Sequence, residues 1–167
     1  KWVPGGLLLP YARDGAQRDS IRVANLRAVV AIAPWGGMAW GPDGPAGISA
    51  PLLLIAGDRD HTVDYASGAR AFFEAATGAR RYLLTFHGAG HALGFGPAPE
   101  QMSHRLWDIN WFEDPVWRKD RIIGVNLHML TAFLDRYVKG DESRAVYLDG
   151  LVSDSNSGHW QAPAGTA

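Results

Sequence analysis

An aspartate and a histidine each follow a short apolar segment of the sequence, and together they could form a proton-relay pair. Asp60 comes shortly after the segment 51–56, and His91 comes shortly after the segment 81–86. A carboxylate that accepts the Nδ1 proton of an imidazole fixes the tautomer of the ring and leaves Nε2 free to take a proton from a nucleophile. The alternative is structural: Asp60 caps the helix that follows it, and His91 is a turn histidine with a satisfied hydrogen bond.

Three short segments predict the strands of the β-sheet that would position this pair. Their sequences are LRAVVAIA at 26–33, PLLLIA at 51–56 and RYLLTF at 81–86. The first is apolar and β-branched and is closed by Pro34, so we expect a strand that is buried on both faces. The second starts at a proline, which the first position of a strand tolerates, and it stops at Gly57.

The segment between the second and third strands predicts a helix, and this makes the strand pairing parallel. Residues 65–76 carry alanine and phenylalanine at spacings of three and four, and Gly78 follows them. A strand, a helix and a second strand form a right-handed unit in which both strands run the same way. Because parallel strands end at the same edge of a sheet, we expect Asp60 and His91 to meet there.

A long helix is predicted later in the sequence, where it would cover one face of the sheet. Asp114 and Pro115 are a typical helix start, with a capping side chain and a proline at the first helical position. Residues 93–114 predict an ordered loop or short helical excursion, and the polar tail from Ser153 is expected to be loosely held. The apolar stripe of the helix continues until Gly140 through Ile123, Leu127, Leu130, Leu134 and Val138.

The composition describes one ordinary globular domain. The 167 residues include 16 Lys+Arg against 17 Asp+Glu, 47% hydrophobic residues and no cysteine, which excludes collagen-like, disordered and disulfide-stapled proteins. A net charge of −1 gives no basic surface for nucleic acid, and the apolar segments are too short for a membrane span. We therefore expect no nucleic-acid partner and no transmembrane segment.

These segments resemble the C-terminal half of an α/β-hydrolase, particularly the dienelactone hydrolase-like branch that includes cutinase-like polyester hydrolases and platelet-activating-factor acetylhydrolase-like lipases. The matching sequences are LRAVVAIAPW, PLLLIAGDRDHTV and YLLTFHGAGH, and FLDRYVKGD resembles the closing helix of that branch. The resemblance implies an α/β fold that is the C-terminal part of an α/β-hydrolase, with three parallel central strands and flanking helices. It would form a single incomplete domain over 1–167, with an inter-element segment at 1–21, a core at 22–141 and a tail at 142–167.

The resemblance makes Asp60 the acid and His91 the base of a catalytic triad, in the chain order nucleophile, acid, histidine. The nucleophile motif G-x-S-x-G occurs nowhere in the 167 residues. In this fold the nucleophile precedes the strand at 26–33, so we expect it in an upstream part of the same polypeptide, together with the donors that bind the oxyanion. The chain alone is then expected to be inactive.

A tryptophan at the end of the first strand is the main candidate for substrate binding. In cutinase-like polyester hydrolases a similar Ala-Pro-Trp places an indole beside the scissile ester, which makes Trp35 a substrate-binding residue and Met38 and Trp40 weaker candidates. An indole suits the acyl or aromatic groups of a small-molecule or polymeric ester. The alternative is that Trp35 only packs at the start of a loop.

Neither a cofactor site nor a metal site is predicted. Gly88 and Gly90 follow a strand, as in a dinucleotide-binding turn, but Leu93 stands where the third glycine is needed. His87 and His91 have a spacing that brings metal ligands together on a helix but not in a glycine-broken turn.

Two hypotheses remain: a carboxylic-ester hydrolase, and a catalytically inactive α/β-hydrolase-like domain that serves as a binding or scaffold module. A serine at the upstream elbow favours the enzyme, and a substituted serine favours the binding module. A cysteine there would keep an enzyme but indicate dienelactone hydrolase chemistry, and an aspartate nucleophile of the haloalkane-displacement type is also possible on this scaffold.

Overall fold

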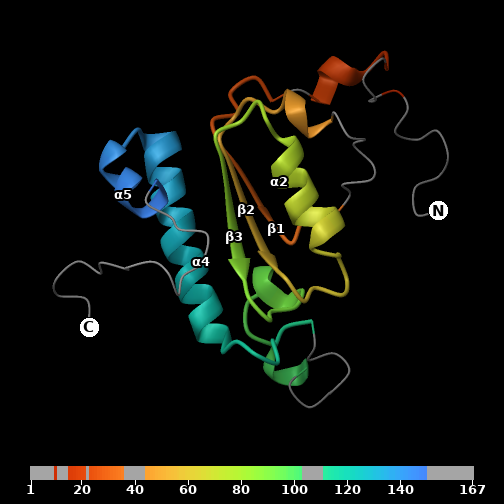
Figure 1. Ribbon diagram of the computed structural model, residues 1–167, viewed down its shortest axis with the longest axis vertical. Coiled ribbons are helices and arrows are strands. Elements are labelled where there is room, and N and C mark those ends of the chain that lie inside the picture. Colours follow the sequence, from red (N-terminus) through yellow and green to blue (C-terminus); the bar gives the residue numbers. More distant parts are fainter. Residues whose placement is uncertain (1–9, 11–14, 22, 36–43, 103–110, 150–167) are drawn as a thin grey trace.

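The chain forms a parallel β-sheet between two layers of helix. The computed structural model describes residues 10, 15–21, 23–35, 44–102 and 111–149. The strand order is β1-β2-β3, with β1 (Val29–Ile32), β2 (Leu52–Gly57) and β3 (Arg81–Phe86). α4 (Lys119–Leu134) covers one face of the sheet and α2 (Ala71–Ala75) covers the other (Figure 1). The prediction of three parallel strands with flanking helices is confirmed.

β2 is buried along its whole length because it is paired on both edges and covered on both faces. Leu53 and Ile55 pack in the core cluster that includes Ile122 of α4. Leu52 and Leu54 pack in a second cluster on the α2 side. Alternate side chains of a strand point to opposite faces, so a strand covered on both faces needs an uninterrupted apolar sequence.

β1 is only partly buried, which corrects the expectation of a strand buried on both faces. Within the described residues β1 pairs with β2 alone, so its other edge has no strand against it. Leu26, just before the strand, is half exposed. The apolar composition of 26–33 indicated a strand correctly but could not tell how many neighbours that strand has.

The helix predicted over 65–76 is present but irregular. One turn of π-helix (Ala66–Arg70) leads into α2, and the backbone at Gly68 departs from helical angles. α2 ends at Ala75, three residues before the glycine that was expected to follow the helix directly. Phe72 and Phe73 still pack against the sheet at the predicted positions.

α4 begins later than predicted. Its first residue is Lys119, whereas Asp114 and Pro115 lie in the turn before it. The Asp114 side chain does act as a cap, because Oδ1 accepts hydrogen bonds from the backbone N–H groups of Val116 and Trp117, but it caps that turn and not the helix. A π-helical turn (Asp135–Lys139) extends α4 to Gly140, whose positive φ of 80° ends it as predicted.

The face that α4 buries differs from the predicted stripe. Of the predicted stripe, Leu130 packs against the core, but Leu127, Leu134 and Val138 are exposed. The helix instead buries a face that contains two polar side chains, formed by Lys119, Ile122, Asn126, Met129, Ala132 and Phe133. The apolar periodicity predicted the helix correctly but selected the wrong face of it as buried, because such a pattern assigns only apolar residues to the core.

Short helical turns connect these elements. The remaining turns are Arg18–Ile21, Pro45–Gly47, Ala92–Gly94, Glu100–Met102 and Glu142–Arg144, and α5 covers Ala145–Leu148. The loop expected over 93–114 contains Glu100–Met102 and begins within Ala92–Gly94, while 103–110 and the tail from Ser153 lie outside the described residues. In the described part of the chain, none of the helices has the length and apolar character needed to cross a membrane.

A polar cluster ties α5 to the sheet and to the end of the α4 extension. Asp149 Oδ1 accepts hydrogen bonds from Arg80 at 2.7 Å and from the Tyr82 hydroxyl at 3.0 Å. Asp149 Oδ2 pairs with Arg136 at 2.8 Å, and the Arg136 side chain is buried. The hydrogen bonds from Arg136 and Arg80 hold the pKa of Asp149 well below its usual range.

Asp149→Asn is therefore expected to destabilise the protein at neutral pH and to reduce its sensitivity to acid. A carboxyl whose pKa is lowered by folding stabilises the native state above its unfolded pKa, about 4, and this contribution disappears as the pH falls toward the folded pKa. The measurement is the urea midpoint between neutral pH and pH 3. Glu74→Gln, which removes an exposed pair on α2, is the matched control and should leave that pH dependence unchanged.

Candidate active site

The ends of β2 and β3 approach each other so closely that only glycine fits at the end of β2. A Cβ on Gly57 would lie 2.2 Å from the carbonyl oxygen of Ala89. That oxygen accepts a hydrogen bond from the N–H of Arg59 at 3.0 Å, and the N–H of Asp58 donates to Phe86 at 3.2 Å. These contacts join the turn after β2 to the turn after β3, and they bring the two predicted residues to the same edge of the sheet.

Asp60 and His91 are in direct contact. Nδ1 of His91 lies 2.8 Å from Oδ2 of Asp60, and the two side chains are 22% and 2% exposed. The other oxygen of Asp60 accepts hydrogen bonds from the backbone N–H groups of Thr62 and Val63, each at 2.8 Å. A carboxylate only accepts hydrogen bonds, so Nδ1 carries the proton, and whenever the ring is neutral Nε2 is the nitrogen that can accept one. The predicted contact is confirmed; the catalytic role of the two residues stays a prediction.

Both interpretations of Asp60 apply to the same side chain. Oδ1 caps the turn that follows β2 and not the helix itself, which the structural alternative predicted it to cap, while Oδ2 binds the imidazole. The two backbone hydrogen bonds fix the carboxylate in place, which in turn fixes the orientation of the ring.

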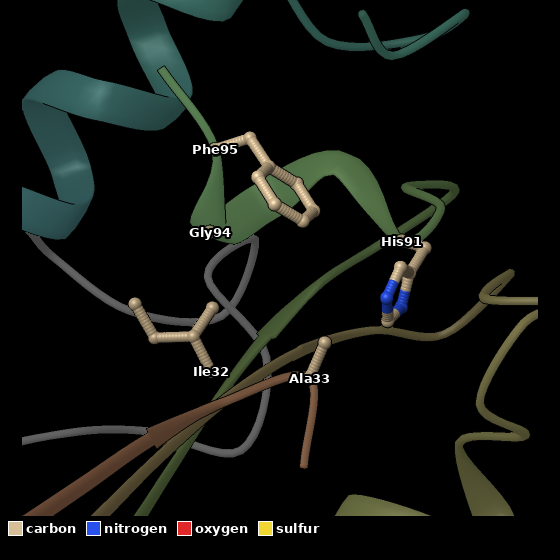
Figure 2. A pocket seen from close by; sticks show the side chains of 5 residues that line it. All are labelled: Ile32, Ala33, His91, Gly94 and Phe95. Carbon is tan, nitrogen blue, oxygen red and sulfur yellow. The ribbon is translucent and has the colours of Figure 1, made fainter. Parts of the chain in front are cut away.

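The imidazole of His91 lines a small cavity. Ile32, Ala33, Gly94 and Phe95 form the rest of its wall, and its volume is about 270 Å³ (Figure 2). Ala33 follows β1 with a φ of 45°, in the left-handed region that alanine seldom adopts, and its N–H donates to the Ile55 carbonyl at 2.7 Å. The wall is apolar apart from the imidazole, so it suits a nonpolar group held beside Nε2.

Two aromatic side chains from the loop after β3 lie beside the imidazole of His91. Neither was predicted to be a site residue. The ring of Trp111 meets the imidazole edge-to-face at 6.1 Å between centroids, and Phe95 lies 6.4 Å away. Phe112 packs against Phe95 at 5.9 Å. Phe95 and Trp111 are nearly half exposed, so both present apolar area to solvent beside the imidazole. The only sequence signal was the aromatic content of a loop that follows His91.

The predicted substrate-binding residues are placed only in part. Trp35 follows β1 and is 68% exposed, so it does not act as a core residue, but it is not among the residues that line the cavity. Met38 and Trp40 lie outside the described residues.

A second carboxylate–imidazole pair occurs in the same two turns. Nδ1 of His87 lies 2.9 Å from Oδ2 of Asp58, and the N–H of Gly88 donates to the other oxygen at 2.6 Å. The hydrogen bond to His87 is the main cause that lowers the pKa of Asp58. The His87 side chain is 69% exposed and is not among the residues that line the cavity beside His91.

Neither a serine bonded to His91 nor a metal site accompanies the pair among the described residues. The hydroxyls of Ser20, Ser67 and Ser143 bond near neighbours in the chain, and none of the described serines bonds to His91. Across the described ranges, no three His, Cys, Asp or Glu side chains gather in a way that could hold a metal ion.

Comparisons with known proteins do not add to this geometry. No protein-family model matches the chain, and no curated protein matches it. The case for a function therefore depends on the residues themselves.

Proposed function

We propose that Asp60 and His91 are the acid and base of a carboxylic-ester hydrolase. The observation that carries the proposal is the 2.8 Å hydrogen bond between a buried, doubly anchored carboxylate and an imidazole that lines a cavity. Such an arrangement is needed to hold one tautomer of a general base and to stabilise the imidazolium that forms during proton transfer. An upstream part of the same polypeptide would supply the nucleophile, since G-x-S-x-G is absent from the chain.

The reaction would proceed through Nε2 of His91, which takes up and gives back one proton in each of two steps. The ring takes the proton of the nucleophile as that atom bonds to the ester carbonyl carbon, and Asp60 stabilises the resulting imidazolium. Nε2 then gives the proton to the leaving alcohol as the ester C–O bond breaks, which leaves an acyl-enzyme. A water molecule, deprotonated by Nε2 in the same way, then bonds to the acyl carbon. Nε2 returns that proton to the nucleophile as the bond between nucleophile and acyl group breaks, which releases the carboxylic acid and regenerates the nucleophile.

The surroundings of the base favour esters with a bulky acyl or aryl group. Phe95 and Trp111 offer partly exposed rings beside the imidazole, and Ile32 adds aliphatic surface to the cavity. Aromatic side chains contribute large apolar area and edge-to-face contacts to such groups. The substrate would be a small-molecule or polymeric ester.

Expression of the polypeptide with its preceding residues tests the proposal. We expect this longer protein to hydrolyse p-nitrophenyl butyrate and to react covalently with a fluorophosphonate probe, whereas the 167-residue chain alone shows no hydrolysis above buffer. A rate in the chain alone that is lost in His91→Ala would contradict an upstream nucleophile. An upstream elbow with no nucleophilic side chain would instead support the binding or scaffold module.

Trp35→Ala in the longer protein is expected to raise KM for bulky esters about 3- to 10-fold and to change KM for acetate esters little, because an exposed indole contributes contact area only to large groups. The measurement is KM for butyrate, benzoate and acetate esters of p-nitrophenol. Trp35→Phe, which keeps an aromatic ring, is the matched control. Equal changes of KM for all three esters would indicate that the Trp35 indole does not contact the variable group of the ester.

A further inference from the structure

Two buried polar side chains of α4 reach across to the turn that carries His91. Nζ of Lys119 donates a hydrogen bond to the carbonyl oxygen of Ala92 at 2.7 Å. Nδ2 of Asn126 donates to the next carbonyl, that of Leu93, at 2.9 Å. The two acceptors are the first two residues after His91 and begin the short helical turn Ala92–Gly94.

The residues just before α4 hold the other end of the same turn. Oδ2 of Asp114 accepts a hydrogen bond from the N–H of Gly90, the residue before His91, at 2.7 Å. Nε1 of Trp117 donates to the carbonyl oxygen of His87 at 2.9 Å. Backbone groups on both sides of His91 are therefore bonded to one segment, 114–126.

Burial of these polar groups needs a reason, because each position could hold an apolar residue of the core. Lys119 is 8% exposed and Asn126 is 7% exposed. Removing an ammonium group or an amide from water is unfavourable unless it is hydrogen-bonded. Oδ1 of Asn126 has no partner among the described residues, and burial lowers the pKa of Lys119. The hydrogen bonds that compensate for this burial go to the carbonyl oxygens of the two residues after His91.

We infer that Lys119 and Asn126 are positioning residues for His91: by binding the carbonyls of Ala92 and Leu93 they fix the backbone that aims the imidazole at Asp60. The inference rests on the proposed function, since the aim of the ring matters for reaction only if His91 is the base. A displacement of about 1 Å is enough to break a hydrogen bond of 2.8 Å or to lower a rate by about 100-fold.

The test observes the imidazole directly and needs no activity. In ¹⁵N-histidine-labelled protein, the Nδ1 proton of His91 should give a protected resonance with the shifts of the Nδ1–H tautomer, and Asp60→Asn should change it. Lys119→Met and Asn126→Leu keep similar side-chain volumes but remove the donors, so each is expected to lose this resonance and to give mixed tautomers. Lys119→Arg keeps a donor and is expected to retain the resonance.

Met129→Ala is the matched control, because it truncates a buried side chain of the same helix that does not bond to the His91 turn. It should lower stability and leave the tautomer of His91 unchanged. If Lys119→Met does not fold, Asn126→Leu decides, since it removes an uncharged group. The inference is overturned if the folded donor variants keep the wild-type resonance, or if Met129→Ala loses it as well.

An assay of the longer protein separates this inference from the proposed function. Loss of the resonance in the donor variants, combined with a kcat about 10- to 100-fold lower and little change in KM, supports both. If the donor variants lose the resonance but the longer protein does not hydrolyse esters, the proposed function is refuted. The positioning of His91 by Lys119 and Asn126 is still supported in that case.

Discussion

His91→Ala in the longer polypeptide is expected to reduce kcat/KM for p-nitrophenyl butyrate by about 10³- to 10⁴-fold, because it removes the only group proposed to move protons. Asp60→Asn should come close to that loss, since an amide in place of Oδ2 can donate to Nδ1 and favour the wrong tautomer. The measurement is initial rates with substrate below KM. Circular dichroism on each variant checks that the protein is folded.

The second pair supplies an unusually close control. His87 lies four residues before His91, is bonded to Asp58 through the same ring nitrogen, and is attached to the same turn. His87→Ala should leave kcat/KM within about twofold of the wild-type value, because the His87 side chain is mostly exposed and does not line the cavity beside His91. A large loss of kcat/KM in His87→Ala would show that the wrong pair has been assigned. A wild-type kcat/KM in His91→Ala would show the same.

The contact between Asp60 and His91 was predictable because parallel strands impose it. The apolar segments at 51–56 and 81–86 are separated by a helix, so their carboxyl ends must lie at one edge. What the sequence could not distinguish was this pair from Asp58 and His87, which are attached to the same two turns. The difference is burial and the cavity wall, and both depend on residues distant in sequence such as Ile32 and Phe95.

The rotation of α4 was not predictable from periodicity, for a physical reason. Helical patterning assigns apolar residues to the core, and it selected a stripe that includes Leu127 and Leu134, both of which are exposed. The buried face instead contains Lys119 and Asn126, whose polar groups are satisfied by carbonyls more than 25 residues away in the chain. The sequence around a polar residue does not indicate its burial when the hydrogen-bond partner is distant in the chain.

The start of α4 shows the same limit. Asp114 followed by proline has the residue types of a helix cap, and the side chain does accept two backbone N–H groups. Its other oxygen bonds the N–H of Gly90, which holds the carboxylate against the turn of His91. The capping side chain therefore serves a tertiary contact, and the helix starts at Lys119.

The second large effect concerns Gly57, the residue that lets the two turns meet. Gly57→Ala is expected to lower the free energy of unfolding by about 3 kcal/mol or more, because its Cβ would overlap backbone atoms, which cannot move aside as a flexible side chain can. The three atoms nearest to that Cβ are Ala89 O at 2.2 Å, Ala89 C at 2.6 Å and Gly90 O at 2.7 Å. Relief requires the β2 and β3 turns to separate, which breaks the hydrogen bond from Arg59 to Ala89. Urea denaturation followed by tryptophan fluorescence measures the change.

The same chain offers the opposite case at Gly124, a glycine inside α4 whose added Cβ would meet no atom within 4 Å. Gly124→Ala should therefore stabilise the protein by about 0.5–1 kcal/mol, since alanine loses less backbone entropy in a helix. If both variants shift the urea midpoint in the same direction, the close approach at Gly57 is not what restricts that position. If Gly57→Ala destabilises the fold and also removes the Nδ1 proton resonance of His91, the junction of the two turns is what holds the imidazole against Asp60.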